Sequence, residues 1–433
     1  ISLEKNSRRR NFMGPFNLYY DYRDILRAPR LALSGKKIWI LIIGNIAGFI
    51  TYWVFSYLSL YLAGITIGNA ISQYGLYPCL YGNEAEWYSW LFYYLGIIAW
   101  VIAILLSSTA VSRVTVKQLK GNDFFSASDA WSYVNRHWHA IVFSPVAITL
   151  IIVFFILFAA LFALACSIPY LGEFLFAVPY LLYLFGSIFT IYSLIVLFVS
   201  FLYTPSIVGV YEEDTMGTVF NSYSITAGNA WRVIIYNILL FPLLVIGMEI
   251  FSWFAINGVG FINYIFGCEW FMDATLANMT SYASSLVCPQ WMCETIACIR
   301  NEVAGWFGLY YSVPSIFSAN CSILPTTMSG TETIASTLLS ISYLLIGFSI
   351  LSYGLSIISV GETIMFIIFK KKSDDDDLLQ RKDEDEIEDE IEDEFTFEDE
   401  DIDEQDTSST SKEDDSNTNG LDGTDDNPNK EDE

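Results

Sequence analysis

The sequence predicts an all-α integral membrane protein with six transmembrane helices, arranged as three units of an elbow helix plus a helical hairpin, and a disordered acidic C-terminal tail. The first observation is composition, because 53% of the 433 residues are hydrophobic although the net charge is −26. The second is where the charge lies: residues 373–433 hold 30 Asp or Glu and 4 Lys or Arg, whereas residues 1–372 hold 18 of each sign. This division excludes a soluble globular enzyme, a nucleic-acid binder and a wholly disordered chain.

The third observation is six apolar stretches, each long enough to cross the roughly 30 Å hydrocarbon core of a bilayer. They are Ile38–Ala63, Trp90–Ser112, Ala140–Ala165, Phe174–Tyr203, Val233–Ile256 and Ala335–Val360. We expect helices because lipid cannot satisfy the hydrogen bonds of an open backbone. The fourth and sixth stretches are long, so we expect them to tilt or to kink at Pro179 and Gly354.

Basic residues predict the orientation. Seventeen of the 18 bases of residues 1–372 precede the odd-numbered spans or follow the even-numbered ones, and Arg300 is the exception. The positive-inside rule places both termini in the cytoplasm of a cell (plasma or inner) membrane. We therefore expect a basic cytoplasmic segment with an amphipathic helix (1–37), a six-span membrane domain (38–372) and a cytoplasmic tail (373–433).

The outer segments hold an even number of cysteines, which predicts disulfides in an oxidising compartment. These are Cys79, Cys268, Cys288, Cys293, Cys298 and Cys321. Five lie in residues 257–334, which we expect to form an aromatic outer cap, either on the outer leaflet or as an ordinary disulfide-tied core. The spacing of Cys288, Cys293 and Cys298 matches no common zinc pattern, so we expect no metal site.

A short amphipathic segment precedes each odd-numbered span. In the second of these elbows, Ser126 and Asp129 form a capping-box pattern that predicts where the helix begins. Trp138 enters the third span, and Trp231 enters the fifth in the same way. We interpret this similarity as three tandem units in one orientation, each with an interfacial elbow.

The elbow run from Phe124 through Ser126, Asp129 and Trp131 to Trp138 resembles the signature of bacterial six-span membrane proteins. These include the membrane domain associated with glycerophosphodiester phosphodiesterases and related families of unknown function. The resemblance covers roughly residues 117–156, with a weaker echo near Trp231. It implies a six-span architecture but no enzymatic role, because the chain has no phosphodiesterase catalytic domain.

Glu249 is the one ionisable residue well inside an apolar stretch and is a functional candidate by default, although a structural role is the alternative. The sequence contains no motif for catalysis or for a cofactor. We therefore expect a non-enzymatic membrane scaffold or assembly factor that contacts the lipid bilayer. The acidic tail is expected to dock a basic protein partner or only to stay solvated. The alternative function is a small-molecule or ion transporter or channel that uses Glu249.

Overall fold

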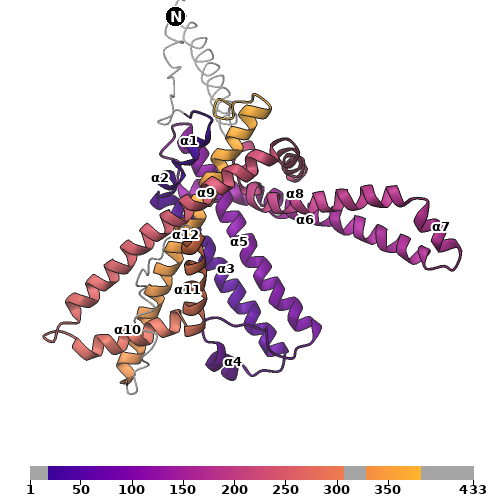
Figure 1. Ribbon diagram of the computed structural model, residues 1–433. Helices are drawn as coiled ribbons and strands as arrows, with labels where there is room; N and C mark the ends of the chain where they lie inside the picture. Colours follow the sequence, from indigo (N-terminus) through magenta and orange to yellow (C-terminus); the bar gives the residue numbers. More distant parts are fainter. Residues whose placement is uncertain (1–17, 307–327, 382–433) are drawn as a thin grey trace, which may run out of the picture. The chain divides into compact units, whose positions relative to one another are not determined.

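The computed structural model describes residues 18–306 and 328–381, apart from a few side chains of helix α11, and this part of the chain is helical without any strand. Six of its helices are long and apolar enough to cross a membrane. They are α3 (Gly35–Leu62), α5 (Trp87–Leu119), α6 (Ala127–Cys166), α8 (Tyr180–Tyr211), α9 (Thr215–Phe266) and α12 (Gly330–Ser373) (Figure 1). Each contains or overlaps one predicted span, so the predicted all-α, six-span membrane fold is confirmed.

Shorter helices connect the long ones. At the N-terminal side are α1 (Tyr22–Ile25) and α2 (Ala28–Ala32). The turns of the three hairpins contain α4 (Ile67–Tyr74), α7 (Leu171–Ala177), and the pair α10 (Asp273–Val287) and α11 (Gln290–Trp306). The three predicted units are therefore α1 to α5, α6 to α8 and α9 to α12. Residues 1–17, 307–327 and 382–433 lie outside the description, and this includes most of the acidic tail.

The elbows differ among the three units. In the first, α2 is separate from α3, whereas the second elbow runs without interruption into the span as the N-terminal third of α6. The third elbow forms the start of α9 and meets the span at Asn229, whose backbone is not helical (φ −124°, ψ 17°). An elbow can thus be a separate helix, a continuous helix or a kinked one.

The two predicted kinks have different outcomes. Pro179 interrupts the fourth apolar stretch, because α7 ends at Ala177 and α8 begins at Tyr180. Proline lacks an amide hydrogen, which favours a break at this position, whereas Pro145, Pro205 and Pro242 lie inside continuous helices. Gly354 lies inside the uninterrupted α12, where it allows Met248 of α9 to pack closely against the backbone.

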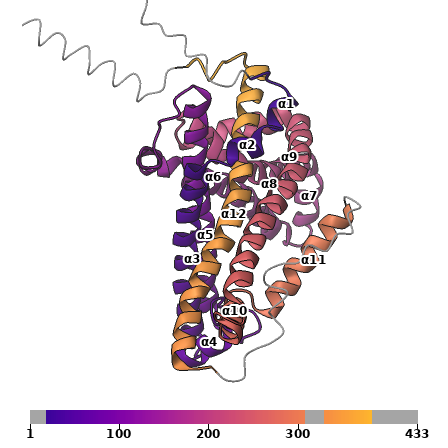
Figure 2. The same ribbon diagram turned by 90° about the vertical axis from the view of Figure 1, so that its left-hand side faces the viewer.

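The second half of α12 is the centre of the packed structure. Nearly every residue from Ser352 to Phe369 is buried, on all sides of the helix. Helices α1, α2, α3, α5, α8 and α9 pack around it, and α6 joins the same apolar core through α5, α8 and α9. Figure 2 shows α12 between the α3–α5 pair and α9. We call this buried part of α12 and the residues around it the hub.

Small residues allow the helices of the hub to approach closely. A Cβ atom on Gly44 of α3 would come within 2.5 Å of the Ser107 side chain of α5. A Cβ atom on Gly209 of α8 would lie 2.9 Å from the Ser112 Cβ of α5 and 3.1 Å from the backbone oxygen of Thr109. Such contacts between small residues are typical of helix packing in membranes.

The far half of the α6–α8 hairpin has few partners outside the hairpin. The last buried residue of α6 is Ile152, and the first buried residue of α8 is Ser193. Between them the two helices pack on each other and on α7 (Figure 1) and otherwise present apolar side chains outward. This is the surface expected of a hairpin that contacts lipid.

Candidate interaction site at the basic end of the bundle

Lysine and arginine residues gather at one end of the helices, which we call the basic end. They are Lys36 and Lys37 at the start of α3, Arg113 and Lys117 near the end of α5, and Lys370, Lys371 and Lys372 at the end of α12. The α3 and α5 ends touch, because Lys37 Nζ donates to Gln118 Oε1 at 2.9 Å. The basic end is therefore the end at which the hub lies.

The N-terminal elbow is fastened to α12 at this end. The Tyr353 hydroxyl donates to the Pro29 backbone oxygen at 3.2 Å, and the Ser356 hydroxyl donates to the Ala32 backbone oxygen at 3.0 Å. Lys372, at the end of α12, lies 3.0 Å from the Asp21 carboxylate just before α1. Residues more than 300 positions apart in the sequence are thus in direct contact.

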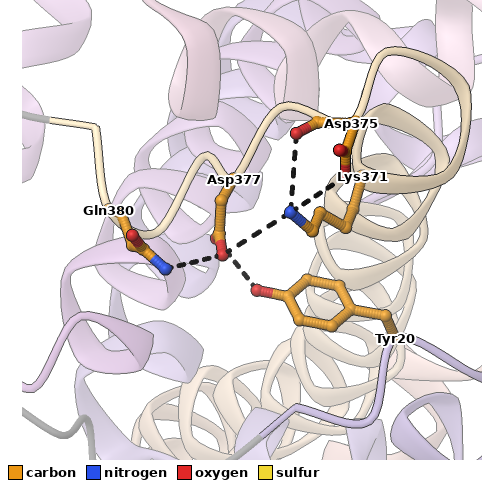
Figure 3. A network of polar contacts seen from close by, with 5 residues as sticks. All are labelled: Tyr20, Lys371, Asp375, Asp377 and Gln380. Atoms are coloured by element: carbon orange, nitrogen blue, oxygen red, sulfur yellow. Dashed lines mark hydrogen bonds and ion pairs between the residues drawn. The ribbon is translucent and has the colours of Figure 1, made fainter.

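The same place holds residues 374–380, which we call the tail root. Asp377 is its centre: it accepts hydrogen bonds from the Tyr20 hydroxyl and from Gln380 Nε2, both at 2.9 Å (Figure 3). Lys371 Nζ lies 3.2 Å from an Asp375 carboxylate oxygen and 4.0 Å from Asp377. The tail root is therefore held by hydrogen bonds and ion pairs beside the N-terminal elbow.

Apolar packing and electrostatics support the tail root. Leu378 is buried in the apolar core of the hub. The Lys370 ammonium, 2.9 Å away, lowers the pKa of the Asp374 carboxyl. Burial, together with the adjacent Asp377 carboxylate, raises the pKa of the Tyr20 hydroxyl. Both shifts favour the protonation states that the network needs, an ionised Asp374 and a neutral Tyr20 that donates its hydrogen bond.

Asp24 of α1, close in sequence to Tyr20 and Asp21, is fully buried. Its carboxyl lies 3.5 Å from the partly exposed Arg27 guanidinium. Burial nevertheless raises the pKa of Asp24, since removal from water disfavours the ionised form more than Arg27 and the nearby backbone amides favour it. A charged residue of an amphipathic elbow is expected on its polar face, whereas the structure turns Asp24 inward.

A buried ion pair joins α5 and α8 in the hub. Arg113 Nη2 lies 2.6 Å from Glu212 Oε1, and the guanidinium lies 4.4 Å above the ring centre of Tyr133 on α6. The Tyr133 hydroxyl in turn donates to the Val208 backbone oxygen at 2.6 Å. Sequence reasoning had placed Arg113 in a cytoplasmic loop, but α5 continues to Leu119 and carries it into the packed interior.

The predicted capping box of the second elbow is confirmed. Ser126 Oγ accepts from the Asp129 backbone amide, and the Asp129 carboxylate accepts from the Ser126 amide, both at 3.2 Å, so the predicted capping box is present. Trp131 packs against the hub core. Phe124 is 94% exposed, and Trp138 and Trp231 also point outward, as side chains at a membrane interface do.

Glu249 lies on the half of α9 beyond the hub and is half buried. Two surface grooves are described: one of about 1020 Å³ between α6, α7 and α8, and a smaller one on α5. Both are lined almost wholly by apolar side chains, and Glu249 lines neither. The role of Glu249 therefore stays a prediction.

The cysteine prediction needs correction. Cys79, Cys268 and Cys298 have free thiols, as does Cys166. The physical reason is their separation onto different elements: Cys79 contacts the Tyr93 hydroxyl on α5, whereas Cys268 follows α9 and contacts the Tyr264 backbone oxygen. Cys288 does not belong to this free set. The Cys293 side chain and all of Cys321 lie outside the described residues, so pairing among these three stays a prediction.

Comparison with known proteins adds no relative: no family model, no curated protein and no solved structure matches this chain.

Proposed function

We propose that the protein is a non-enzymatic membrane scaffold whose acidic tail, anchored at the tail root, binds a basic protein partner. The observation that carries the proposal is the tail root: Asp377 is bonded to Tyr20 of the N-terminal elbow, while Lys372 pairs with Asp21. A tail that served only to keep the protein soluble would have no need of an anchored exit point. Anchoring limits the volume that the arm explores and so raises its effective concentration near the basic end.

The chemistry of the arm suggests the partner. Residues 382–433 carry 26 acidic residues and 3 basic ones. The acids of the tail root, by contrast, are engaged with lysines of α12 and with Tyr20. The remaining acids create a strongly negative field that attracts a basic surface and weakens as salt rises. The basic end would then lie in the cytoplasm with both termini, and the three elbows would rest on the inner leaflet of the cell membrane.

Transport through Glu249 is the alternative. It has less support, because both described grooves are apolar and neither includes Glu249. The resemblance of the second elbow to the phosphodiesterase-associated membrane domain supports the six-span architecture more than either function, because the related families are of unknown function. Cys288, Cys293 and Cys321 remain candidates for a disulfide that would stabilise the outer cap.

The test compares three chains expressed in native membranes: the full chain, a chain ending at Gln380, and a full-length chain whose acids in residues 383–394 are changed to Asn and Gln. The second keeps the whole tail root and the third keeps tail length. Crosslinking followed by mass spectrometry should recover basic proteins with the full chain only, and binding of a polylysine peptide should fall with rising salt. Identical crosslinked sets for all three chains would dismiss the scaffold proposal.

A further inference from the structure

Glu362 is buried at the centre of the hub. It lies on α12, within the segment that α3, α5, α8 and α9 surround, and only 1% of it is exposed. Neither of its carboxylate oxygens has a hydrogen bond of adequate geometry among the described residues. An isolated ionised carboxylate in such surroundings is strongly disfavoured.

The hydroxyl of Tyr203, a fully buried residue of α8, is the polar neighbour of the Glu362 carboxyl. This hydroxyl accepts a hydrogen bond from Asn237 Nδ2 of α9 at 3.1 Å and lies 3.4 Å from Met365 Sδ. Glu362 therefore sits at the junction of α8, α9 and α12, at the end of a short polar chain from Asn237 through Tyr203.

The cations of the surrounding helices are engaged elsewhere. On α5, Arg113 pairs with Glu212 at 2.6 Å, and on α3, Lys37 Nζ donates to the Leu31 backbone oxygen at 3.0 Å. On α9, Arg232 donates to Asn229 Oδ1 at 2.8 Å. Lys36 of α3 donates to the Asp123 backbone oxygen at 2.9 Å, and Lys117 is buried on α5. Further charged groups lie on α1 and at the end of α12 itself. There Asp24 faces Arg27, and Lys370, Lys371 and Lys372 face Asp374, Asp375 and Asp21.

The neighbouring oxygens do not form a metal site. The Thr363 hydroxyl donates to the Ser359 backbone oxygen at 2.6 Å, and the Tyr203 oxygen already accepts from Asn237. Hard cations such as Ca²⁺ and Mg²⁺ require about six or more oxygen ligands. Glu362 offers two oxygens, whereas a proton requires only one.

We propose that Glu362 is a proton-binding site, a carboxylic acid that is neutral at neutral pH and holds the hub together in that form. The proposal goes beyond the scaffold function and does not depend on the acidic tail. Loss of this proton would place a negative charge at the buried junction of α8, α9 and α12. Alkaline pH should therefore loosen the hub and separate α12 from α8 and α9.

Infrared spectroscopy of the purified full chain in nanodiscs tests the proposal directly. At about pH 7, where ordinary carboxyls are ionised, wild type should show the C=O stretch of a protonated carboxylic acid, shifted in D₂O. Glu362→Gln should lack that band. Asp24→Asn and Glu249→Gln, the controls at two other carboxyls that are wholly or partly buried, should keep it. The melting temperature of wild type should fall by several degrees between about pH 6 and about pH 9, and that of Glu362→Gln should fall less.

Two results would overturn the proposal: a wild-type spectrum that is indistinguishable from that of Glu362→Gln, or stabilisation of wild type but not of Glu362→Gln by Na⁺, K⁺ or Mg²⁺. The second result would assign the site to a metal ion. If Glu362→Gln fails to fold, the double variant Asp24→Asn/Glu249→Gln decides. Retention of its C=O band would support the proposal, and absence of the band would refute it.

Discussion

The Arg113–Glu212 pair should make an asymmetric contribution to stability. The Arg113 side chain is 0% exposed, whereas Glu212 is 10% exposed at the end of α8. Glu212→Leu removes the carboxylate that lies 2.6 Å from the buried guanidinium, and we expect it to reduce the free energy of unfolding by about 3–5 kcal/mol. Arg113→Met leaves a carboxylate that reaches water more easily, so we expect a smaller loss of about 1–3 kcal/mol.

The double variant Arg113→Met/Glu212→Leu removes both charges and should lose less than the sum of the single variants, with a coupling energy of at least about 2 kcal/mol. Glu212 adopts a left-handed backbone conformation (φ 59°), but leucine has a Cβ as glutamate has, so that strain is common to wild type and variant. Unfolding by SDS in mixed micelles, followed by tryptophan fluorescence, provides the free energies. Additive losses, or a larger loss for Arg113→Met than for Glu212→Leu, would refute the reasoning.

Four further predictions follow from the same contacts. Gly209→Leu should destabilise the protein by about 1–3 kcal/mol in the SDS titration, because a Cβ there lies 2.9 Å from Ser112 Cβ. Gly258→Ala is the control, as its Cβ meets open space, and any measurable loss with it would undermine the comparison. Burial raises the pKa of Asp24, so stability that is complete at low pH is lost as pH rises through the folded-state pKa. Asp24→Asn should flatten that dependence of melting temperature on pH, and an unchanged slope would contradict it. Tyr20→Phe should weaken the tail root by about 0.5–1.5 kcal/mol, seen as faster hydrogen exchange of its amides; unchanged exchange would show that the hydrogen bond to Asp377 contributes nothing. Finally, a maleimide should label at least five of the seven cysteines in the denatured, unreduced protein, because four are free and one disulfide among the other three leaves one thiol over. Labelling of a single thiol would favour the original disulfide prediction.

The six spans and the Ser126–Asp129 capping box were predictable because both are local patterns, a long apolar run and a spacing of three residues. The hub charges were not, because burial depends on which helices meet. Glu362 lies beyond the sixth predicted stretch, which ends at Val360, although the apolar run from Ile364 to Phe369 indicates that the helix continues. Arg113 was counted as a loop cation for the same reason: the apolar pattern of its span ends before the helix does.

The placement of these charges explains how such an apolar chain specifies one arrangement of helices. In lipid, apolar side chains gain little by facing another helix rather than an acyl chain, so apolar area alone discriminates weakly between packings. Polar and small groups discriminate strongly, because a mispaired charge inside the bundle is costly. Arg113, Glu362 and Asp24 all lie at the basic end, together with the close approach at Gly209. In the far half of the α6–α8 hairpin, by contrast, α6 has no buried residue beyond Ile152 and α8 has none before Ser193. The register of all three units is therefore set in the hub. If a hairpin took the place of another unit's hairpin, at least one of these charges would be buried away from its present neighbours, even if the apolar surface of the hairpin fitted equally well.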